Sequence, residues 1–571
     1  MNHAAIRHES TQHYCCALEP GKFRIRLETA KNDMTRVTLW HRDKYMSPKL
    51  KKTLQSLPME KVASDGYRDY YEVELSFQMV CLRYYFELES VDGVHTYLGN
   101  TGFVDWVPDD VERMFDCPQT LREEECFVTP QWAHHKVVYQ IFPARFASDK
   151  GVSDKLWYRT PMTGNLDIGG NLRGIISRLD YIRDLGADVI YMTPIFASPS
   201  AHKYNTVDYY TIDPAFGTEE DLCELVEKAH SKGMRVVLDA VFNHSGTEFF
   251  AFEDLKKNGE ASAYRDWYYT QSLPVKQVPF KPNYKCFGYF GYMPKLNMTN
   301  PETADYFINV ALYWLRRAKI DGWRLDVGDE VSHTFWRKFR TAIKAEFPEA
   351  LIVGEIWHHA PDFLEGDQWD SVMNYPFFRA IMDFVAGDGI SATAFLGRLG
   401  ELRGSVAPAA WPVLWNLVGS HDTPRLRYCC GENREKHRLA AALQLLSPGM
   451  PMIYYGDEVG LTGGPDPDCR RGMLWDPQRQ DQEMLRWYKS LIRARRKESA
   501  ITQGKTVRED AWDEEGLIRI RRSHEGREVT LLFHSKPGRV SLPELTGKRD
   551  LITGKLFTGT LDGITALALQ D

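Results

Sequence analysis

Four short polar segments each follow a run of apolar residues along the chain. They are Asp239–His244 (DAVFNH), Gly322–Asp326 (GWRLD), Gly354–Trp357 (GEIW) and Gly419–Thr423 (GSHDT). A parallel strand buried on both faces is a continuous apolar run, and the residues that follow it in a closed barrel line the active site. Any one segment alone is more often a solvated turn or a helix cap, but four in this order predict a carboxylate-rich catalytic pocket.

Two of these carboxyl groups suit the cleavage of a glycosidic bond, which needs a protonated acid and a second carboxylate as nucleophile or base. Asp326 and Glu355 close consecutive predicted strands, so we expect them to meet across the mouth of a barrel. Arg324 points to the same side as Asp326 and favours its ionised form, although this pair alone fits a structural ion pair equally well. Apolar neighbours, Ile356 and Trp357, favour a raised pKa for Glu355, as an acid requires.

Further polar groups at the same strand ends suit a polyhydroxylated ligand. Asp239 and the adjacent His421 and Asp422 offer hydrogen bonds, and no packing reason explains why they converge. The predicted pocket is therefore that of a carbohydrate-active enzyme.

The elements that position these residues follow from the periodicity of the chain. Residues 1–125 alternate between polar and apolar in short runs such as FRIRL (23–27) and RYYFEL (83–88), which predicts an antiparallel N-terminal β-sandwich. Residues 126–498 alternate strands with amphipathic helices, which predicts a (β/α)8 TIM barrel of the α/β class. An insertion at about 245–300, after the third strand, has the length of a functional loop. Residues 499–571 return to alternation and predict a C-terminal β-sandwich.

The predicted elements of the barrel can be given by residue. We expect its strands at 137–142, 188–192, 235–238, 322–325, 351–353, 370–373, 414–418 and 452–455. We expect helices at 218–231, 302–318, 332–346, 434–446 and 482–496.

Composition narrows the class of protein. The 571 residues are 43% hydrophobic and 26% charged with a net charge of −7, which predicts a multidomain globular protein with no nucleic-acid partner. The N-terminus lacks an apolar signal region, and no apolar run approaches the roughly 18 residues of a membrane span, so we expect no membrane association. The ten cysteines include no C-x-x-C pair, and we expect them to be free thiols in the cytoplasm.

At these motifs the chain resembles the α-amylase superfamily, glycoside hydrolase family 13. The four segments match its ordered signatures, and Met293–Asn297 (MPKLN) is similar to a segment of the cyclomaltodextrinase, neopullulanase and maltogenic amylase group. Residues 454–464 and the run DPDCRR (466–471) are also similar to that group. The N-terminal domain matches the extra domain typical of these enzymes, so the resemblance covers essentially the whole chain.

The resemblance implies a role for each site residue. Asp326 corresponds to the nucleophile, Glu355 to the acid/base, and Asp422 to the third carboxylate, which favours the distorted sugar ring. The implied substrate-binding residues are Tyr204, Asp239, His244, Arg324 and His421 around the cleaved bond, and Trp357 and Glu330 on the acceptor side. For the last two, an ordinary buried tryptophan and a solvated glutamate at a helix start remain open readings.

The same resemblance implies an activity and an assembly. It implies a retaining hydrolase of α-1,4 bonds in cyclodextrins, maltooligosaccharides and pullulan, which releases mainly maltose, or panose from pullulan, with some transglycosylation. Alternatives are another α-glucan enzyme, such as an α-amylase or a branching or isomerising transferase, and a non-catalytic binding protein. The presence of all three carboxylates argues against a binding protein. The N-terminal domain implies a homodimer in which it packs against the partner's barrel.

Many members of this superfamily bind calcium. The corresponding loops offer Asp149, Asp154, Gly169 and Asn171 as weak candidates, and Lys150 argues against a strong site. We therefore expect that no cofactor is required, with calcium as the one cation the resemblance leaves open.

Overall fold

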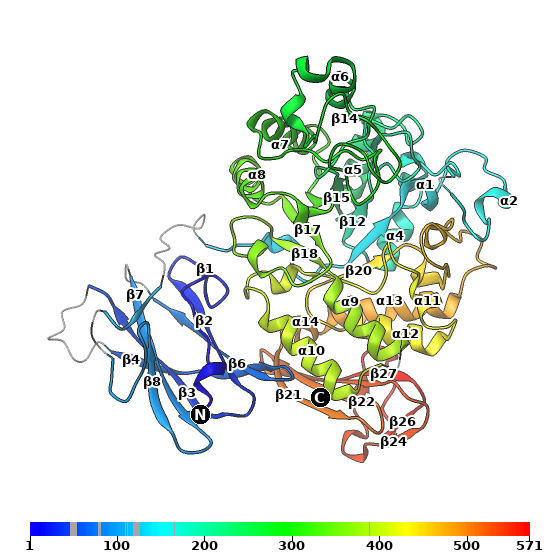
Figure 1. The fold of residues 1–571 in the computed structure, drawn as a ribbon. Helices are drawn as coiled ribbons and strands as arrows, with labels where there is room; N and C mark the ends of the chain where they lie inside the picture. Colours follow the sequence, from blue (N-terminus) through cyan, green and yellow to red (C-terminus); the bar gives the residue numbers. More distant parts are fainter. Residues whose placement is uncertain are drawn as a thin grey trace.

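The computed structural model describes residues 1–45, 54–77, 81–108, 110, 112–117, 126–164, 166–387 and 389–570. The middle of the chain forms a closed barrel (Figure 1). The residues before it form a two-sheet unit, and the residues after it form a smaller sheet unit. This confirms the predicted fold class. The predicted boundary at residue 125 lies outside the described residues.

The N-terminal unit consists of two antiparallel sheets that enclose an apolar core. One sheet has the order β1 (Cys15–Glu19), β2 (Lys22–Ala30), β6 (Arg68–Ser76) and β5 (Glu60–Ser64). The other has the order β4 (Gln55–Pro58), β3 (Met34–Asp43), β7 (Leu82–Ser90), β8 (His95–Gly99) and β9 (Gly102–Val104), with β10 (Phe115–Asp116) paired to β7. Alternate apolar residues such as Ile25, Leu39 and Phe86 face each other between the sheets, as period-2 alternation predicts.

The barrel is a closed parallel sheet in which each strand lies beside the next barrel strand of the chain. Its strands are β11 (Val138–Ile141), β12 (Val189–Met192), β15 (Arg235–Ala240), β16 (Gly322–Leu325), β17 (Leu351–Ile356), β18 (Ser371–Asn374), β19 (Trp415–Leu417) and β20 (Met450–Tyr454). Pairing of β20 with β11 closes the ring. Tyr191, Trp415 and Met452 fill its interior, so the barrel is a packed core rather than a channel.

Helices surround the barrel because each carries an apolar face that must be buried. They are α1 (Pro143–Phe146), α2 (Asp154–Trp157), α3 (Leu172–Ile176), α4 (Leu179–Leu185), α5 (Glu219–Ser231), α6 (Phe250–Asn258), α7 (Pro301–Arg317), α8 (His333–Glu346), α9 (Tyr375–Ile381), α10 (Ala392–Gly404), α11 (Leu426–Cys429), α12 (Arg434–Leu445), α13 (Gln482–Lys497) and α14 (Ser499–Gln503). The long helices start at strong caps: Thr218 and Asp221 form a capping box on α5, and Asn300 caps α7.

The long insertion after β15 folds back onto the end of the barrel at which the strands end. It contains α6 and ends in an extended segment in which Lys295 pairs with His244. Two short strands, β13 (Phe196–Ala197) and β14 (Asp208–Ile212), form a separate hairpin after β12. The insertion therefore lies at the end of the barrel where the polar segments also lie.

The C-terminal unit is an antiparallel sheet with the order β21 (Lys505–Trp512), β22 (Leu517–His524), β23 (Arg527–His534), β27 (Thr565–Gln570) and β25 (Arg549–Asp550). A second pair, β24 (Arg539–Ser541) and β26 (Thr560–Asp562), covers it with an apolar cluster between them.

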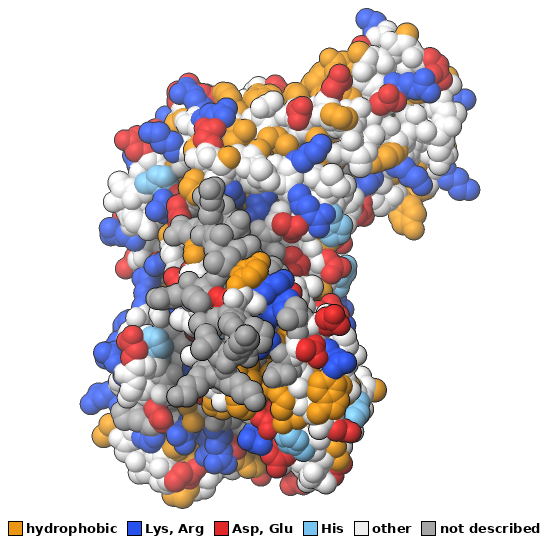
Figure 2. Space-filling model, turned by 90° about the vertical axis from the view of Figure 1, so that its left-hand side faces the viewer, with side chains coloured by type: hydrophobic (Ala, Val, Ile, Leu, Met, Phe, Trp, Pro, Cys, Tyr) orange, Lys and Arg blue, Asp and Glu red, His pale blue; other side chains and the backbone are white. Residues whose placement is uncertain are grey.

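The N-terminal unit is fastened to the barrel through α10. The buried Arg26 donates to the carbonyl oxygens of Gly404 and Val406 at 2.8 and 3.0 Å. On the face in Figure 2, positive and negative side chains are intermixed, so what that face shows of the described residues has no continuous basic patch for a nucleic-acid backbone. No helix in the described part of the chain is both long and apolar enough to cross a membrane.

Candidate active site

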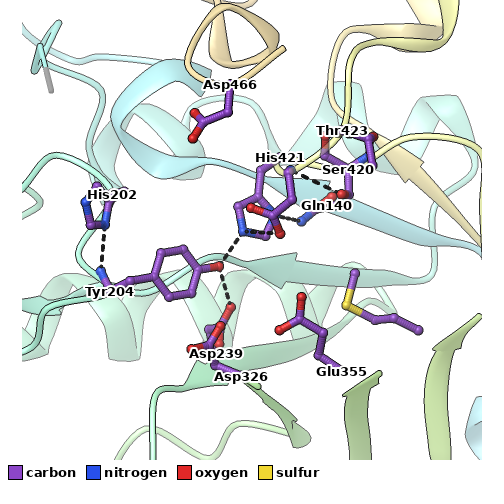
Figure 3. Close-up of polar contacts among 12 residues, drawn as sticks. Gln140, His202, Tyr204, Asp239, Asp326, Glu355, Ser420, His421, Thr423 and Asp466 are labelled. Atoms are coloured by element: carbon purple, nitrogen blue, oxygen red, sulfur yellow. Dashed lines mark hydrogen bonds and ion pairs between the residues drawn. The ribbon is translucent and has the colours of Figure 1, made fainter. Parts of the chain in front are cut away.

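The polar segments converge at the carboxyl-terminal rim of the barrel. Asp239 and Arg324 are paired in register on neighbouring strands β15 and β16, and Glu355 lies on the next strand, β17. Asp326 follows β16 directly. Because the strands are parallel and adjacent, their carboxyl ends bring these four side chains into one cluster. Figure 3 shows the three carboxyl groups of this cluster, Asp239, Asp326 and Glu355, around the pocket.

Arg324 lies at the centre of this cluster and is fully buried. Its Nη1 donates to Asp326 Oδ1 at 2.8 Å and to both carboxylate oxygens of Asp239 at 3.0 Å. Its Nη2 lies 2.8 Å from Glu355 Oε2 as an ion pair without hydrogen-bond alignment. One guanidinium therefore faces three carboxyl groups.

This charge balance differs from the simple sequence expectation that Arg324 keeps Asp326 ionised. Burial raises the pKa of Asp326 well above its usual range, and the charges of Glu355 and Asp239 add to that effect against the opposing pull of Arg324. Burial also raises the pKa of Asp239, to about 6. A single positive charge cannot neutralise three buried carboxylates, so the cluster favours retention of protons.

Glu355 is held from two further directions. The backbone N–H of Val327 donates to its Oε2 at 2.9 Å, and the indole N–H of Trp357 donates to its Oε1 at 3.2 Å. Val327 adopts the left-handed conformation, with φ of 46°, which is uncommon for a β-branched residue. Such strain is found where the surrounding structure fixes a functional geometry.

Tyr204 and His421 form a second wall of the pocket. The tyrosine hydroxyl donates to Asp239 Oδ2 at 3.1 Å and contacts the Nε2 of His421, and the two rings are stacked with centroids 5.5 Å apart. Gln140 from β11 contacts the other histidine nitrogen at 2.8 Å. Burial lowers the pKa of His421 well below its usual range, so the imidazole is neutral and can hydrogen-bond to a sugar hydroxyl.

Asp422 is the most accessible of the three predicted catalytic carboxylates, with 28% of its side chain exposed. His421 Nε2 lies 3.3 Å from its Oδ2, and Arg470 Nη2 donates to its Oδ1 at 3.1 Å. The same arginine donates to the carbonyl oxygen of His421 at 2.8 Å and contacts Asp466 at 2.9 Å. Asp422 is thus fixed in place but open to the pocket.

The remaining predicted ligand residues lie around the cluster rather than in it. The His244 imidazole contacts the carbonyl oxygen of Tyr204 at 3.1 Å and stacks on Phe287 of the insertion, and burial lowers its pKa to about 3. Glu330 lies 3.4 Å from Lys295 Nζ and is partly exposed. His244 is therefore held beside the pocket by its contacts with Tyr204 and Phe287.

Trp357 is not an ordinary buried tryptophan. Its indole is 42% exposed and stacks on Tyr375 with centroids 3.9 Å apart. One face of the ring is thus covered and the other is accessible beside Glu355.

Several contributors to the site have no assigned role in the sequence analysis. Tyr191 donates to Asp239 at 2.6 Å, Lys295 holds Asn243 and Glu330 together, and Arg470 anchors Asp422. Tyr191 could have been found from strand periodicity, because it points into the barrel from the predicted second strand. Arg470 carries no such signal, because the loop that holds it is irregular.

The weak calcium candidates do not fit a calcium cage. Asn171 donates its amide N–H to Asp149 at 2.7 Å, and its oxygen accepts from the backbone of Gly174 as the cap of α3. Asp154 is exposed at the start of α2, and Gly169 packs near Val152. Within the described ranges, no group of three or more His, Cys, Asp or Glu residues could hold a metal ion.

The chain is similar to known proteins over nearly its whole length. The family "Alpha amylase, catalytic domain" matches residues 140–498, and "Alpha amylase, N-terminal ig-like domain" matches residues 1–120. A cyclomaltodextrinase from Geobacillus thermopakistaniensis is 42% identical over 566 residues, covering 96% of each chain. Neopullulanase 2 from Thermoactinomyces vulgaris is 40% identical over 571 residues, covering 97% of this chain and 96% of its own. A solved cyclomaltodextrinase superposes with a TM-score of 0.92 at 36% identity, covering 100% of both chains.

Proposed function

The chain belongs to the α-amylase family of glycoside hydrolases, and we propose that it cleaves α-1,4 bonds of small α-glucans with retention of configuration. The observation that carries this proposal is the shared contact of Asp326 and Glu355 with one guanidinium. Two carboxyl groups that contact one small group lie close together, which favours the roughly 5–5.5 Å between the carboxyl groups of retaining enzymes. Inverting enzymes hold them about 6.5–9.5 Å apart, because a water molecule must fit between them and the sugar.

In the proposed reaction, Asp326 attacks the anomeric carbon while Glu355 gives its proton to the departing glycosidic oxygen. The ester with Asp326 is then attacked by water, whose proton passes to Glu355. Asp422 accepts hydrogen bonds from sugar hydroxyls and Arg470 fixes its position, while Tyr204 and His421 line the cleavage subsite.

We propose cyclodextrins, maltooligosaccharides and pullulan as substrates, with maltose as the main product and panose from pullulan. The names of the related cyclomaltodextrinase and neopullulanase support this choice, together with their coverage of nearly the whole chain. We also propose a homodimer that needs no metal ion. The ten cysteines, all free thiols, support a reducing, cytoplasmic location.

The test is a comparison of initial rates on β-cyclodextrin, pullulan, soluble starch and maltotriose, with products separated by chromatography. Panose from pullulan and maltose from cyclodextrin are expected. Products with new α-1,6 branches, or trehalose, as the main products would instead indicate a branching or isomerising transferase. Starch as the best substrate would indicate an ordinary α-amylase. Dialysis against a chelator should leave the rates unchanged.

A further inference from the structure

Arg425 is a buried arginine that the proposed mechanism does not use. It follows Asp422 by three residues, in the segment after β19, and its side chain is fully buried. Its guanidinium lies over the rings of Tyr454 and Tyr455, 4.1 and 4.7 Å from their centroids. Burying a charged group is costly unless it is paired and hydrogen-bonded, so the partners of this arginine indicate what it does.

The partners of Arg425 include backbone carbonyl groups at both ends of one loop, residues 463–471. Its backbone N–H donates to the carbonyl oxygen of Gly463 at 3.0 Å, and its Nε donates to that of Cys469 at 2.8 Å. Its Nη1 donates to the carbonyl oxygen of Tyr455, which directly follows β20, at 2.5 Å. One residue therefore joins the segments after β19 and β20 and fixes the loop at two points.

The loop 463–471 contacts the third predicted carboxylate of the site. Its Arg470 donates to the carbonyl oxygen of His421 at 2.8 Å and to Asp422 Oδ1 at 3.1 Å. Figure 3 shows Asp466 of the same loop on the side of the pocket where His421 lies. A displacement of this loop would therefore move Arg470 and release Asp422.

These contacts require an arginine rather than any cation. The planar guanidinium donates in several fixed directions at once, whereas a lysine ammonium is a compact point charge without such a fork. Asp457 supplies the opposite charge, because Nη1 of Arg425 donates to its Oδ1 at 3.1 Å. Burial raises the pKa of Asp457 to about 7, so this carboxyl can take up a proton when the cation is absent.

We infer that Arg425 is a positioning residue for the third carboxylate: by bonding both ends of the loop 463–471, it sets the position of Arg470 and therefore of Asp422. The inference rests on the proposed function, in which Asp422 accepts hydrogen bonds from the sugar. Contacts that favour the distorted sugar ring are strongest in the transition state. Loss of this positioning should therefore lower kcat more than it raises KM.

The test is a double-mutant cycle between Arg425 and Arg470, measured as kcat and KM of the full-length enzyme on maltotriose. Arg425→Lys alone should lower kcat by about ten-fold or more and change KM by less than about three-fold. In an Arg470→Ala background, the same substitution should lower kcat by less than about three-fold further, because the contact that it supports is already lost. Thermal unfolding shows whether each variant is folded.

Arg495 provides the matched control. It is also a buried arginine that donates to backbone carbonyl groups, but its acceptors include His135 and Gly449, which lie where β11 and β20 begin, at the opposite end of the barrel. Arg495→Lys should lower the unfolding temperature and leave kcat within about two-fold of wild type.

A second variant keeps the test decisive if Arg425→Lys does not fold. Arg425→Gln combined with Asp457→Asn replaces the buried ion pair with two amides and leaves no unpaired charge, so it can take the same place in the cycle.

Losses of kcat that multiply in the cycle, or a wild-type kcat in a folded Arg425 variant, would overturn the inference. An equal fall in kcat for Arg495→Lys would overturn it as well, because the effect would then belong to any buried arginine. A wild type that cleaves no α-glucan would instead overturn the proposed function.

Discussion

Arg324 sets the electrostatics of the site because, among the residues that the structure describes, it is the one cation in contact with Asp239, Asp326 and Glu355. Its position on β16 places it beside each of them, so it orients all three carboxyl groups at once. The consequence is that one guanidinium stabilises the negative charge of the nucleophile while it also orients the acid/base carboxyl.

The two roles are sequential, so neither carboxyl can replace the other. We expect Asp326→Asn and Glu355→Gln each to lower kcat/KM on maltotriose by at least about 100-fold, and by several orders of magnitude for Asp326→Asn. Steady-state kinetics on correctly folded protein measure this. Asp367→Asn removes an exposed carboxyl outside the site and should keep wild-type rates. More than about a tenth of activity in either catalytic variant would contradict that assignment.

Arg470 should matter almost as much as a direct ligand, because it holds both His421 and Asp422. Arg470→Ala should lower kcat/KM by about 10- to 100-fold, the range for losing a charged hydrogen bond of 1.5–3 kcal/mol. The neighbouring Arg471 pairs with Asp468 at 2.6 Å and provides a matched control. Similar losses in Arg471→Ala would mean that the loop as a whole, rather than the contact with Asp422, is responsible.

At the scale of elements, the apolar runs were sufficient to locate each barrel strand within a few residues. They were less able to show where a strand ends: the predicted strand at 351–353 continues to Ile356, and Glu355 lies within β17. A buried charge inside a strand breaks the apolar pattern, so periodicity ends the strand too early at functional positions. The contact between Arg470 and Asp422 joins two irregular loops that are distant in sequence. The residue pattern within one loop does not predict which residue of the other loop it contacts.

Gly354 shows how β17 presents Glu355. A Cβ at this position would lie 2.2 Å from Cε3 of the buried Trp369, and ring and backbone have little room to move apart. We expect Gly354→Ala to reduce the free energy of unfolding by about 1–3 kcal/mol through overpacking, and to reduce activity by displacing Glu355. Urea unfolding and kinetics measure both. Gly151→Ala, where a Cβ meets nothing within 4 Å, should change neither.

Packing of α12 against α13 makes the fold sensitive to acid. His437 is fully buried beside Tyr488, and burial lowers its pKa to about 3. The unfolded chain binds a proton near pH 6.5, so the stability from this neutral histidine is full above that pH and is lost as pH falls toward 3.

At pH 5 this single group should therefore destabilise the fold by about 2 kcal/mol relative to pH 7.5. His437→Gln should show a smaller loss of stability between pH 7.5 and 5 than the wild type, whatever its absolute stability. Urea unfolding at both pH values measures the difference, with the exposed His358→Gln as control. An unchanged loss in His437→Gln would show that other groups control the acid response.

At the scale of the whole molecule, the N-terminal unit packs against α10 of its own barrel and carries exposed aromatic side chains away from that contact. Arg26 bonds the backbone at the end of α10, and a Cβ at Gly400 would lie 1.8 Å from the carbonyl oxygen of Ser64, so strand and helix are in close contact. Elsewhere on this unit the large side chains Tyr45 and Trp106 are 74% and 46% exposed. Exposed aromatic residues of this kind are enriched in protein interfaces.

We therefore expect a homodimer in which the N-terminal unit of one subunit packs against the partner's barrel and narrows its active-site mouth. A narrowed mouth admits small or cyclic glucans more readily than bulky starch, because a long chain needs room on both sides of the cleaved bond. Light scattering should give twice the mass of one 65.8 kDa chain at micromolar concentration, and cyclodextrin should be cleaved faster than starch. Removal of residues 1–125 should yield a monomer with a lower cyclodextrin-to-starch rate ratio, provided circular dichroism shows a folded barrel. If the N-terminal unit is only a carbohydrate-binding module, the full chain will be monomeric, or the ratio will not change on removal.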